Sequence, residues 1–137
     1  MNYRLYGFKI GKDIHFDIHN KCIYRLTTLG KDNNFVFSTI QFNDTMMNLF
    51  LYLLLHGRDR VISKDELLKK IWEEKNLTPS SQRLWQVYTS LNKRIKELGV
   101  PEQLLQHIKR SGYTVNGDDV IPIYYKINDV PYHYEVI

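Results

Sequence analysis

The feature that most constrains this chain is a run of apolar residues at helical spacing between positions 80 and 99. Five of them follow one another at intervals of four, three, four and three residues, the spacing of one buried helical face: Leu84, Tyr88, Leu91, Ile95 and Leu98. Ser80 or Ser81 is a typical N-terminal cap, and Gly99 is a typical C-terminal stop. The pattern therefore predicts an amphipathic helix over residues 81–97.

The opposite face of this predicted helix carries amides, hydroxyls and positive charge: Gln82, Arg83, Gln86, Thr89, Ser90 and Lys93. These side chains project away from the apolar face because successive residues turn by about 100° around a helix. The face holds no carboxylate before Glu97. Such groups suit base edges and phosphates, although an ordinary amphipathic surface helix has the same spacing.

Composition limits the number of domains and the class of partner. With 137 residues, 43% of them hydrophobic, the chain is long enough to bury one core, and we expect a single domain. The formal net charge of +4 is unevenly distributed. Residues 79–116 carry six basic and two acidic side chains, whereas residues 117–137 carry one and four. A local positive excess of this kind favours polyanions, either nucleic acid or an anionic membrane.

Cysteine usage and hydropathy indicate the compartment. Cys22 is the only cysteine, so no disulfide can form within the chain and a reducing cytosol is the natural compartment. Residues 1–10 alternate polar and apolar side chains and lack the apolar core of a signal peptide. The longest apolar run, residues 49–55, is far shorter than the roughly 20 residues that a membrane span needs. We therefore expect a cytoplasmic domain that makes no membrane contact itself.

The first 57 residues predict β-structure followed by a buried helix. Alternating apolar and polar residues predict four short strands at residues 3–10, 14–18, 22–26 and 35–42, the last two joined by the polar turn 30–34. Such tight turns favour an antiparallel meander. Asn43 or Asp44 then caps a helix that ends at Gly57. This helix is apolar on most sides, which places it in the centre of the core.

Two further elements and an extension complete the prediction. Ser63 and Glu66 form a capping box that opens a second helix, with an apolar inner face over residues 67–72. Residues 107–115 predict a β-hairpin with an exposed basic tip at 109–112. The acidic segment 117–137 contains Pro122 and Pro131, which allow only edge strands or loop.

Three segments lie in a characteristic order and spacing. The first is Val61-Ile62-Ser63-Lys64-Asp65-Glu66-Leu67-Leu68 with Ile71-Trp72, the second is Leu84-x-Gln86-x-Tyr88-x-x-Leu91, and the third is Ile108-Lys109-Arg110-Ser111-Gly112-Tyr113. Together they resemble the OmpR-type winged helix-turn-helix DNA-binding domain over about residues 12–116. The Leu-x-Gln pattern and the basic Gly-Tyr wing are most similar to the ToxR/CadC-like branch of transcription regulators.

This resemblance implies an α+β fold, a winged helix-turn-helix with an N-terminal four-stranded antiparallel sheet, three helices and a C-terminal β-hairpin wing. Residues 1–116 would form the DNA-binding domain, and residues 117–137 an acidic, Tyr-rich C-terminal extension of the same domain. Regulators of the ToxR/CadC branch are often membrane-anchored. The chain would then be either the cytoplasmic part of a longer regulator or a stand-alone protein.

The resemblance also implies roles for individual residues. The helix over 81–97 would enter the major groove of DNA and present Gln82, Arg83, Gln86, Val87, Thr89, Ser90, Lys93 and Arg94. Val87 would contact a thymine methyl group, and Gln86 would pair with adenine. The wing over 107–115 would lie on the adjacent backbone and minor groove. Phosphates would be held by Trp72, Lys109, Arg110 and Tyr113.

Each phosphate contact has a structural alternative. Trp72 equally fits a helix-packing aromatic, Tyr113 fits a core residue at the base of the wing, and Lys109-Arg110 fits a solvated turn. Family members also often carry arginines where this helix has Thr89, Ser90 and Asn92. Few guanidinium groups are therefore available to recognise guanine, and a function that does not involve DNA binding stays open.

The sequence gives little support for a metal site or for a catalytic site. His15, Asp17 and His19 alternate on a predicted strand, with Cys22 just past the turn, and all are zinc ligands in type. Because a structural zinc site usually draws ligands from two separate elements, we interpret them as the polar face of a strand and expect no metal and no other cofactor. No serine elbow, phosphate-cradling glycine loop, metalloprotease motif or paired-carboxylate motif occurs, so we expect no enzyme.

These observations predict a sequence-specific transcriptional regulator that binds double-stranded DNA. A single module of this kind buries roughly 600–1,000 Å², which favours binding as a homodimer or in tandem. The alternative is a winged helix used as a protein–protein interaction module without strong intrinsic DNA binding, because the Tyr-rich extension suits a protein interface. That extension would pack as an extra strand, cover the basic face or contact a protein partner.

Overall fold

The computed structural model describes residues 2–29 and 34–127; residues 30–33 of the expected turn 30–34 and the C-terminal residues 128–137 lie outside the described part. Four strands form at the predicted places: β1 (Tyr3–Ile10), β2 (Ile14–Asp17), β3 (Cys22–Leu29) and β4 (Asn34–Gln41). Each pairs with the next in antiparallel register, for example Phe8 with Phe16 and Ile23 with Ile40. The predicted meander is therefore confirmed.

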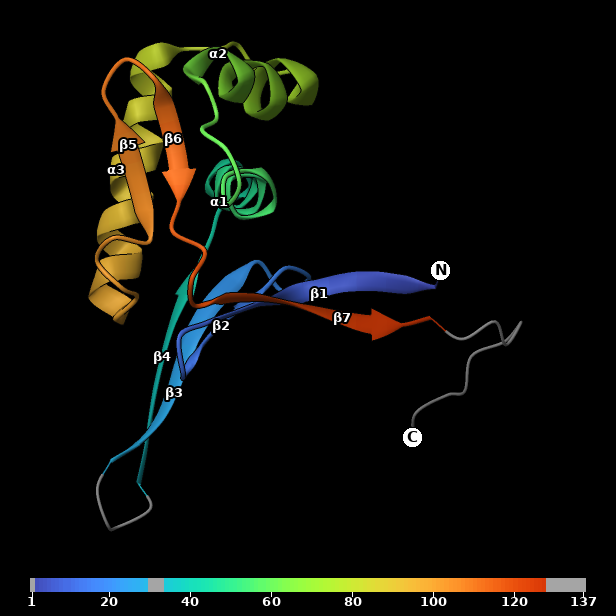
Figure 1. Ribbon diagram of the computed structural model, residues 1–137, viewed down its shortest axis with the longest axis vertical. Helices are drawn as coiled ribbons and strands as arrows, with labels where there is room; N and C mark the ends of the chain where they lie inside the picture. The colour runs from blue at the N-terminus through green and yellow to red at the C-terminus, as the bar shows by residue number, and fades with distance from the viewer. Residues whose placement is uncertain (1, 30–33, 128–137) are drawn as a thin grey trace.

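A fifth strand extends this sheet and corrects the expected strand count. β7 (Val120–Lys126) pairs antiparallel with β1, which gives the order β4-β3-β2-β1-β7 in the described part of the chain. The two strands run side by side away from the helices (Figure 1). The described part of the acidic extension thus packs as an extra strand, and Pro122 lies on the edge strand of the sheet.

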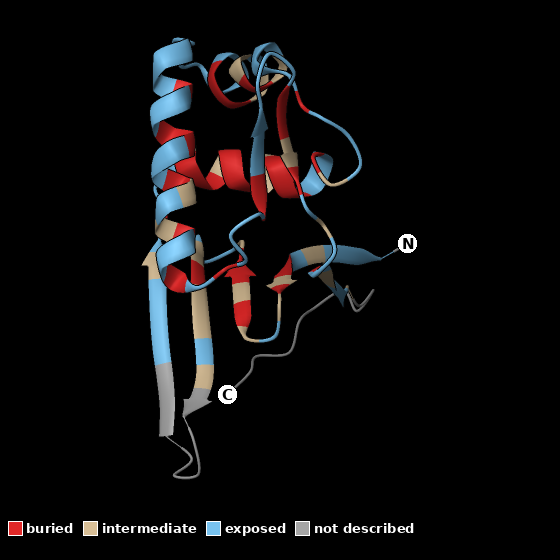
Figure 2. Cartoon of the chain, turned by 60° about the vertical axis from the view of Figure 1, so that its left-hand side comes forward, coloured by how far each residue is buried: buried red, intermediate tan, exposed pale blue. Residues whose placement is uncertain are grey.

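Helix α1 (Asp44–His56) forms the centre of the molecule. The Asn43 side chain accepts a hydrogen bond from the Met46 amide (2.9 Å), and Gly57 ends the helix, both as predicted. α1 lies between the large sheet and the layer made by α2 and the wing, with α3 along one side (Figure 1). Its fully buried side chains include Leu49, Phe50, Leu53 and Leu54. Burial is correspondingly dense along α1 and on the inner side of α3 (Figure 2).

Aromatic rings join α1 to the sheet. Phe50 of α1 lies 4.8 Å from Phe16 of β2, measured between ring centroids, and Phe42 meets both rings at 5.8 Å. Phe8 of β1 stacks beside Phe16 at 6.3 Å. All four rings are buried. Burying a phenylalanine side chain contributes on the order of 1.5–3 kcal/mol, so this contact is a main source of stability between sheet and helices.

The second helical segment is less regular than the sequence pattern predicts. α2 (Lys64–Leu67) continues into a π-helical turn, η2 (Leu68–Trp72), and a 3-10 turn, η3 (Glu73–Lys75). The Ser63 side chain caps α2 by accepting from the Glu66 amide (3.1 Å). The reciprocal half of the expected capping box is replaced by other contacts, because the Glu66 carboxylate bonds to Arg60 and Tyr52 instead.

Helix α3 (Ser81–Leu98) and the hairpin of β5 (Leu105–Ile108) and β6 (Gly112–Val115) complete the helix-turn-helix and the wing. The hairpin is antiparallel, with Ile108 paired to Gly112. Ile62 bridges to Tyr113 through two backbone hydrogen bonds of 2.7 and 2.8 Å. The wing is thus joined directly to the segment that precedes α2.

Glu66 connects three parts of the helical layer. Its carboxylate accepts a bidentate pair of bonds from Arg60, at 2.9 and 2.6 Å, and one from the Tyr52 hydroxyl of α1. The Arg60 guanidinium, followed by the Tyr52 hydroxyl, lowers the pKa of Glu66 to about 2. A carboxyl group whose pKa is lower in the folded than in the unfolded state stabilises the fold above the unfolded pKa.

Replacing Glu66 with glutamine tests this network. Glu66→Gln should lower the free energy of unfolding at pH 7 by about 1–2 kcal/mol, because the bidentate ion pair is partly exposed. In the wild type this stabilisation should disappear as the pH falls from about 4.5 to about 2. The measurement is urea unfolding at several pH values. Glu74→Gln, which removes the exposed pair with Lys70, is the matched control and should change stability by roughly 0–0.5 kcal/mol. An unchanged acid dependence in Glu66→Gln would contradict this account.

Candidate nucleic-acid interface

Helix α3 presents a continuous polar face to solvent. The Ser80 side chain caps its start by accepting from the Arg83 amide (3.1 Å), and Gly99 ends it with a φ of +111°. The apolar side of α3 is buried, as the spacing predicts. The predicted outer residues are all exposed: Gln82, Arg83, Gln86, Thr89, Ser90 and Lys93. Amide, hydroxyl and cationic groups therefore line one surface over about three turns.

Two residues expected to face the major groove, Thr89 and Arg94, make contacts within the protein. The Thr89 hydroxyl donates to the backbone oxygen of Trp85 (2.9 Å), with that of Gln86 at 3.2 Å. Arg94 is half-buried and reaches the sheet side, where Nη2 lies 3.4 Å from the Gln41 backbone oxygen and Nη1 lies 3.7 Å from Met46 Sδ. Arg94 thus joins α3 to β4 and α1.

Three residues expected to touch DNA have their side chains in the core. Val87 is 7% exposed, Trp72 is 3% exposed and Tyr113 is 4% exposed. Val87 lies three residues after Leu84, on the inner face of α3, so its methyl groups do not reach a base edge. Trp72 and Tyr113 follow the structural alternatives of helix packing and wing-base packing. We therefore correct the expectation for these three side chains.

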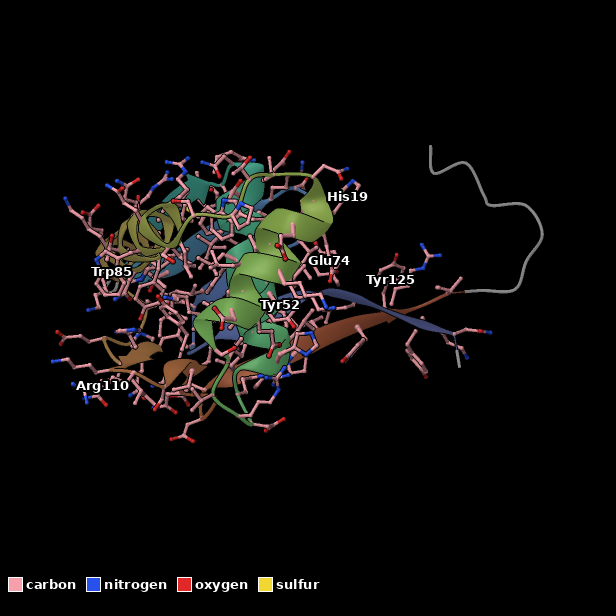
Figure 3. All side chains as sticks on the ribbon, turned by 90° about the horizontal axis from the view of Figure 1, so that it is seen from above. His19, Tyr52, Glu74, Trp85, Arg110 and Tyr125 are labelled. Atoms are coloured by element: carbon pink, nitrogen blue, oxygen red, sulfur yellow. The ribbon has the colours of Figure 1, made fainter. Side chains whose placement is uncertain are left out.

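The wing exposes its basic tip. Lys109 and Arg110 are exposed in the turn between β5 and β6, which the Ser111 amide closes by donating to the Ile108 oxygen (3.0 Å). Arg110 has a φ of +70°, in the left-handed region that non-glycine residues rarely adopt. In a view along the long axis, Arg110 and Trp85 lie at one end of the molecule and Tyr125 of β7 at the other (Figure 3).

Four aromatic side chains join α3 to the wing. Trp85 lies 5.7 Å from Tyr88 and 5.0 Å from His107, and Tyr113 lies 4.8 Å from Tyr88 and 4.7 Å from His107. Burial raises the pKa of Tyr88 to about 12 and also raises the pKa of Tyr113. Both phenols therefore stay neutral at physiological pH. This ring cluster fixes the wing against the helix.

Sequence reasoning missed Trp85 and His107 as parts of this cluster. Trp85 lies on the flank of the polar face, one turn before Thr89, and 47% of its surface is exposed. A tryptophan on the polar side of an amphipathic helix was the available signal. The contact with His107 spans 22 positions of sequence, so helical spacing alone did not reveal it.

The cations of this surface lack carboxylate partners among the described residues. In residues 2–29 and 34–127, the ion pairs are Lys21–Asp44, Arg25–Asp13, Arg60–Glu66 and Lys70–Glu74. None of them involves α3 or the wing tip. The positive charges of Arg83, Lys93, Lys109 and Arg110 are therefore available to an anionic partner.

The side chains considered as zinc ligands make other contacts. His15 stacks on Tyr24 at 5.2 Å. The Asp17 carboxylate accepts bonds from the backbone amide (3.0 Å) and the side-chain amide (2.7 Å) of Asn20. The part of the chain that the structure describes contains no cluster of three or more potential metal ligands.

Comparison with solved structures identifies the class of fold. The DNA-binding domain of E. coli CadC aligns with a TM-score of 0.59 at 15% sequence identity, covering 88% of this chain and 96% of that chain. The DNA-binding domain of the response regulator AdeR, in complex with an intercistronic region, aligns with a TM-score of 0.55 at 17% identity, covering 79% and 98%. The fold is that of winged helix-turn-helix DNA-binding domains, as the sequence predicted.

Sequence comparison adds no further relative. No protein-family model and no curated protein sequence matches the chain. Among the described residues, none of the helices combines the length and the apolar character that a membrane crossing requires.

Gly112 permits the close approach of the wing to the segment before α2. Its φ is +139°, and a Cβ atom there would lie 2.1 Å from the Ile62 backbone oxygen. Gly112→Ala should therefore lower the free energy of unfolding by roughly 2–4 kcal/mol, measured by urea unfolding. Gly11→Ala is the matched control, because its φ is +66° but no atom lies within 4 Å of the added Cβ. It should cost only about 1 kcal/mol. Equal losses in both variants would show that the contact with Ile62 is unimportant.

Proposed function

We propose that this chain is a sequence-specific, double-stranded DNA-binding regulator of transcription. α3 would enter the major groove, and the wing would lie on the adjacent backbone or minor groove. The observation that carries the proposal is the exposed, carboxylate-free surface of α3 from Gln82 to Lys93, beside the exposed cations Lys109 and Arg110. The shared fold with the DNA-binding domains of CadC and AdeR supports it.

Affinity in this proposal comes mainly from phosphates. Arg83 and Lys93 on α3, with Lys109 and Arg110 on the wing, would neutralise backbone charge and release counterions. The rigid junction of wing and helix would reduce the entropy lost on binding, because the cations are already held on one side of the protein.

Sequence preference in this proposal comes from the polar centre of α3. The amides of Gln82 and Gln86 match the donor and acceptor edge of adenine. Because the Thr89 hydroxyl is bonded within the helix, its methyl group would instead contact a thymine methyl. Ser90 supplies a further hydroxyl. Arg94, Val87, Trp72 and Tyr113 hold the fold.

Assembly and location follow from the same proposal. One module contacts a short stretch of DNA, so binding as a homodimer or in tandem to repeated half-sites would supply the missing affinity. DNA binding would take place in the cytoplasm of a bacterial cell.

A protein–protein interaction module is the second candidate function. Five large apolar side chains on β1 and β7 are between 47% and 57% exposed: Tyr3, Tyr6, Ile121, Tyr124 and Tyr125. They lie on β1 and β7, the strand pair that extends beyond the helices (Figure 1). Exposed tyrosines are favoured at protein interfaces. Under this alternative, changing the surface of α3 would leave the interaction with the partner unaltered.

The wing cations provide a test of phosphate binding. The double variant Lys109→Ala with Arg110→Ala should weaken binding to all duplex sequences alike, because phosphates carry no base identity. The slope of log K against log salt should fall by about 1.8, since each lost phosphate contact contributes about 0.9. The measurement is fluorescence anisotropy of a labelled duplex across a salt series.

The matched control removes the same two charges from the far end of the protein. Arg4→Ala with Lys126→Ala also deletes one arginine and one lysine, both exposed on the β1–β7 pair. This variant should keep the wild-type slope. If the slope of log K against log salt fell equally in both double variants, binding would depend on net charge alone. This result would contradict the proposed interface.

Gln86 provides a test of base recognition. On a duplex selected for tight binding, Gln86→Ala should relax the preference at one base pair and lose roughly 1–3 kcal/mol of discrimination. Binding to random duplex and its salt slope should stay as in the wild type. Gln103→Ala, which removes an exposed amide outside α3, should leave the preferred sequence unchanged. If Gln86→Ala kept the wild-type preference at every base pair, the proposed role of Gln86 in base recognition would be wrong.

A further inference from the structure

Trp85 is an exposed tryptophan on the helix proposed to bind DNA. Its side chain is 47% exposed, whereas Trp72, the other tryptophan, is 3% exposed. Within the described residues, the indole N–H makes no hydrogen bond. Tryptophan is enriched at interfaces because its apolar ring and its N–H donor can both contact a partner, and both are accessible here.

The indole is held in place by neighbouring rings. Tyr88 stacks against it at 5.7 Å with an interplanar angle of 29°, and His107 of β5 meets its edge at 5.0 Å. His107 is held in turn by Tyr113 at 4.7 Å. Because α3 and the wing both support the ring, little side-chain entropy remains to be lost when a ligand binds.

Trp85 lies beside a basic pocket. His107 also lines a pocket of about 360 Å³, together with Lys64 of α2 and Arg110 and Ser111 of the wing turn. Asp65 is the carboxylate that borders this pocket. Among the described residues, neither Lys64 nor Arg110 forms an ion pair. The surface that leads from Trp85 to the wing tip is therefore suited to phosphate groups.

The position of Trp85 determines what it would meet. If α3 occupies the major groove and the wing reaches the neighbouring minor groove, the protein surface between them crosses the sugar–phosphate backbone that separates the two grooves. Trp85 and His107 form that surface, since their rings connect α3 to β5.

We propose that Trp85 contacts the DNA backbone directly, its indole N–H donating to a phosphate oxygen and its ring covering the adjacent sugar. This inference rests on the proposed DNA-binding function and adds a contact that does not depend on a cationic side chain. Its loss would weaken binding without changing the salt slope, because no counterion is released by a neutral donor.

Tryptophan fluorescence tests the contact directly. Acrylamide, a neutral quencher, should reach Trp85 but not Trp72 in the free protein, because only Trp85 is exposed. Saturating random-sequence duplex should then protect the quenchable emission. Trp85→Phe is the control that assigns this emission, and circular dichroism checks that the variant is folded. Binding itself is followed independently by anisotropy of a labelled duplex.

The affinity of Trp85→Phe supplies a second readout. The phenylalanine ring preserves contact with Tyr88 and His107 but lacks the N–H donor and part of the ring area. Binding should weaken roughly three- to tenfold, the range expected for one hydrogen bond, at an unchanged salt slope. Trp85→Leu, which removes the aromatic ring, should weaken it further.

The outcomes separate this inference from the function on which it rests. Duplex binding with full acrylamide access to Trp85, or wild-type affinity in Trp85→Phe, would overturn the backbone contact and leave the DNA-binding proposal intact. Trp85 would then only support the wing. Absence of duplex binding at low salt would overturn both. Protection together with weaker binding at a constant slope would support the contact.

Discussion

The rest of the structure depends on the burial of α1 between the large sheet and the helical layer. Leu49, Phe50, Leu53 and Leu54 are completely buried, so the helix contributes side chains to both layers at once. Because apolar burial is the dominant favourable term in folding, the contacts that cover this helix also hold the surrounding elements in place. The sheet covers one side of α1 through the Phe16 and Phe50 rings. The remaining sides of α1 are covered by α2, α3 and the wing.

The geometry of the candidate interface follows from this central packing. α3 is held at its C-terminal end by Arg94, which reaches β4, and along its length by the ring cluster that includes Tyr88. The wing is fixed by the backbone bonds between Ile62 and Tyr113. Its relation to α3 is therefore set by buried contacts, and among the described residues the exposed cations of α3 and the wing tip form no ion pairs. Such preorganisation suits recognition of a fixed shape such as a DNA duplex.

Local patterns predicted most of the fold, and contacts between distant segments account for what they missed. The spacing from Leu84 to Leu98 and the caps Ser80 and Gly99 gave helix α3 to within one residue. The pairing of β7 with β1 was only one of three options for the extension, because strand pairing across more than 100 residues leaves no local signal. Val87 was placed on the wrong face of α3 because the buried side is wider than the five-residue stripe. The role of Trp85 depends on His107, which only the folded structure brings near.

The central claim is that α3 and the wing form the surface that binds DNA. The most direct measurement is amide chemical-shift mapping by NMR as a duplex is added to the protein. The account predicts saturable changes at 82–93 and 109–111, on α3 and the wing turn, with the β1–β7 pair (3–6 and 121–126) unaffected. Changes confined to the β1–β7 pair, or no change at low salt, would contradict it.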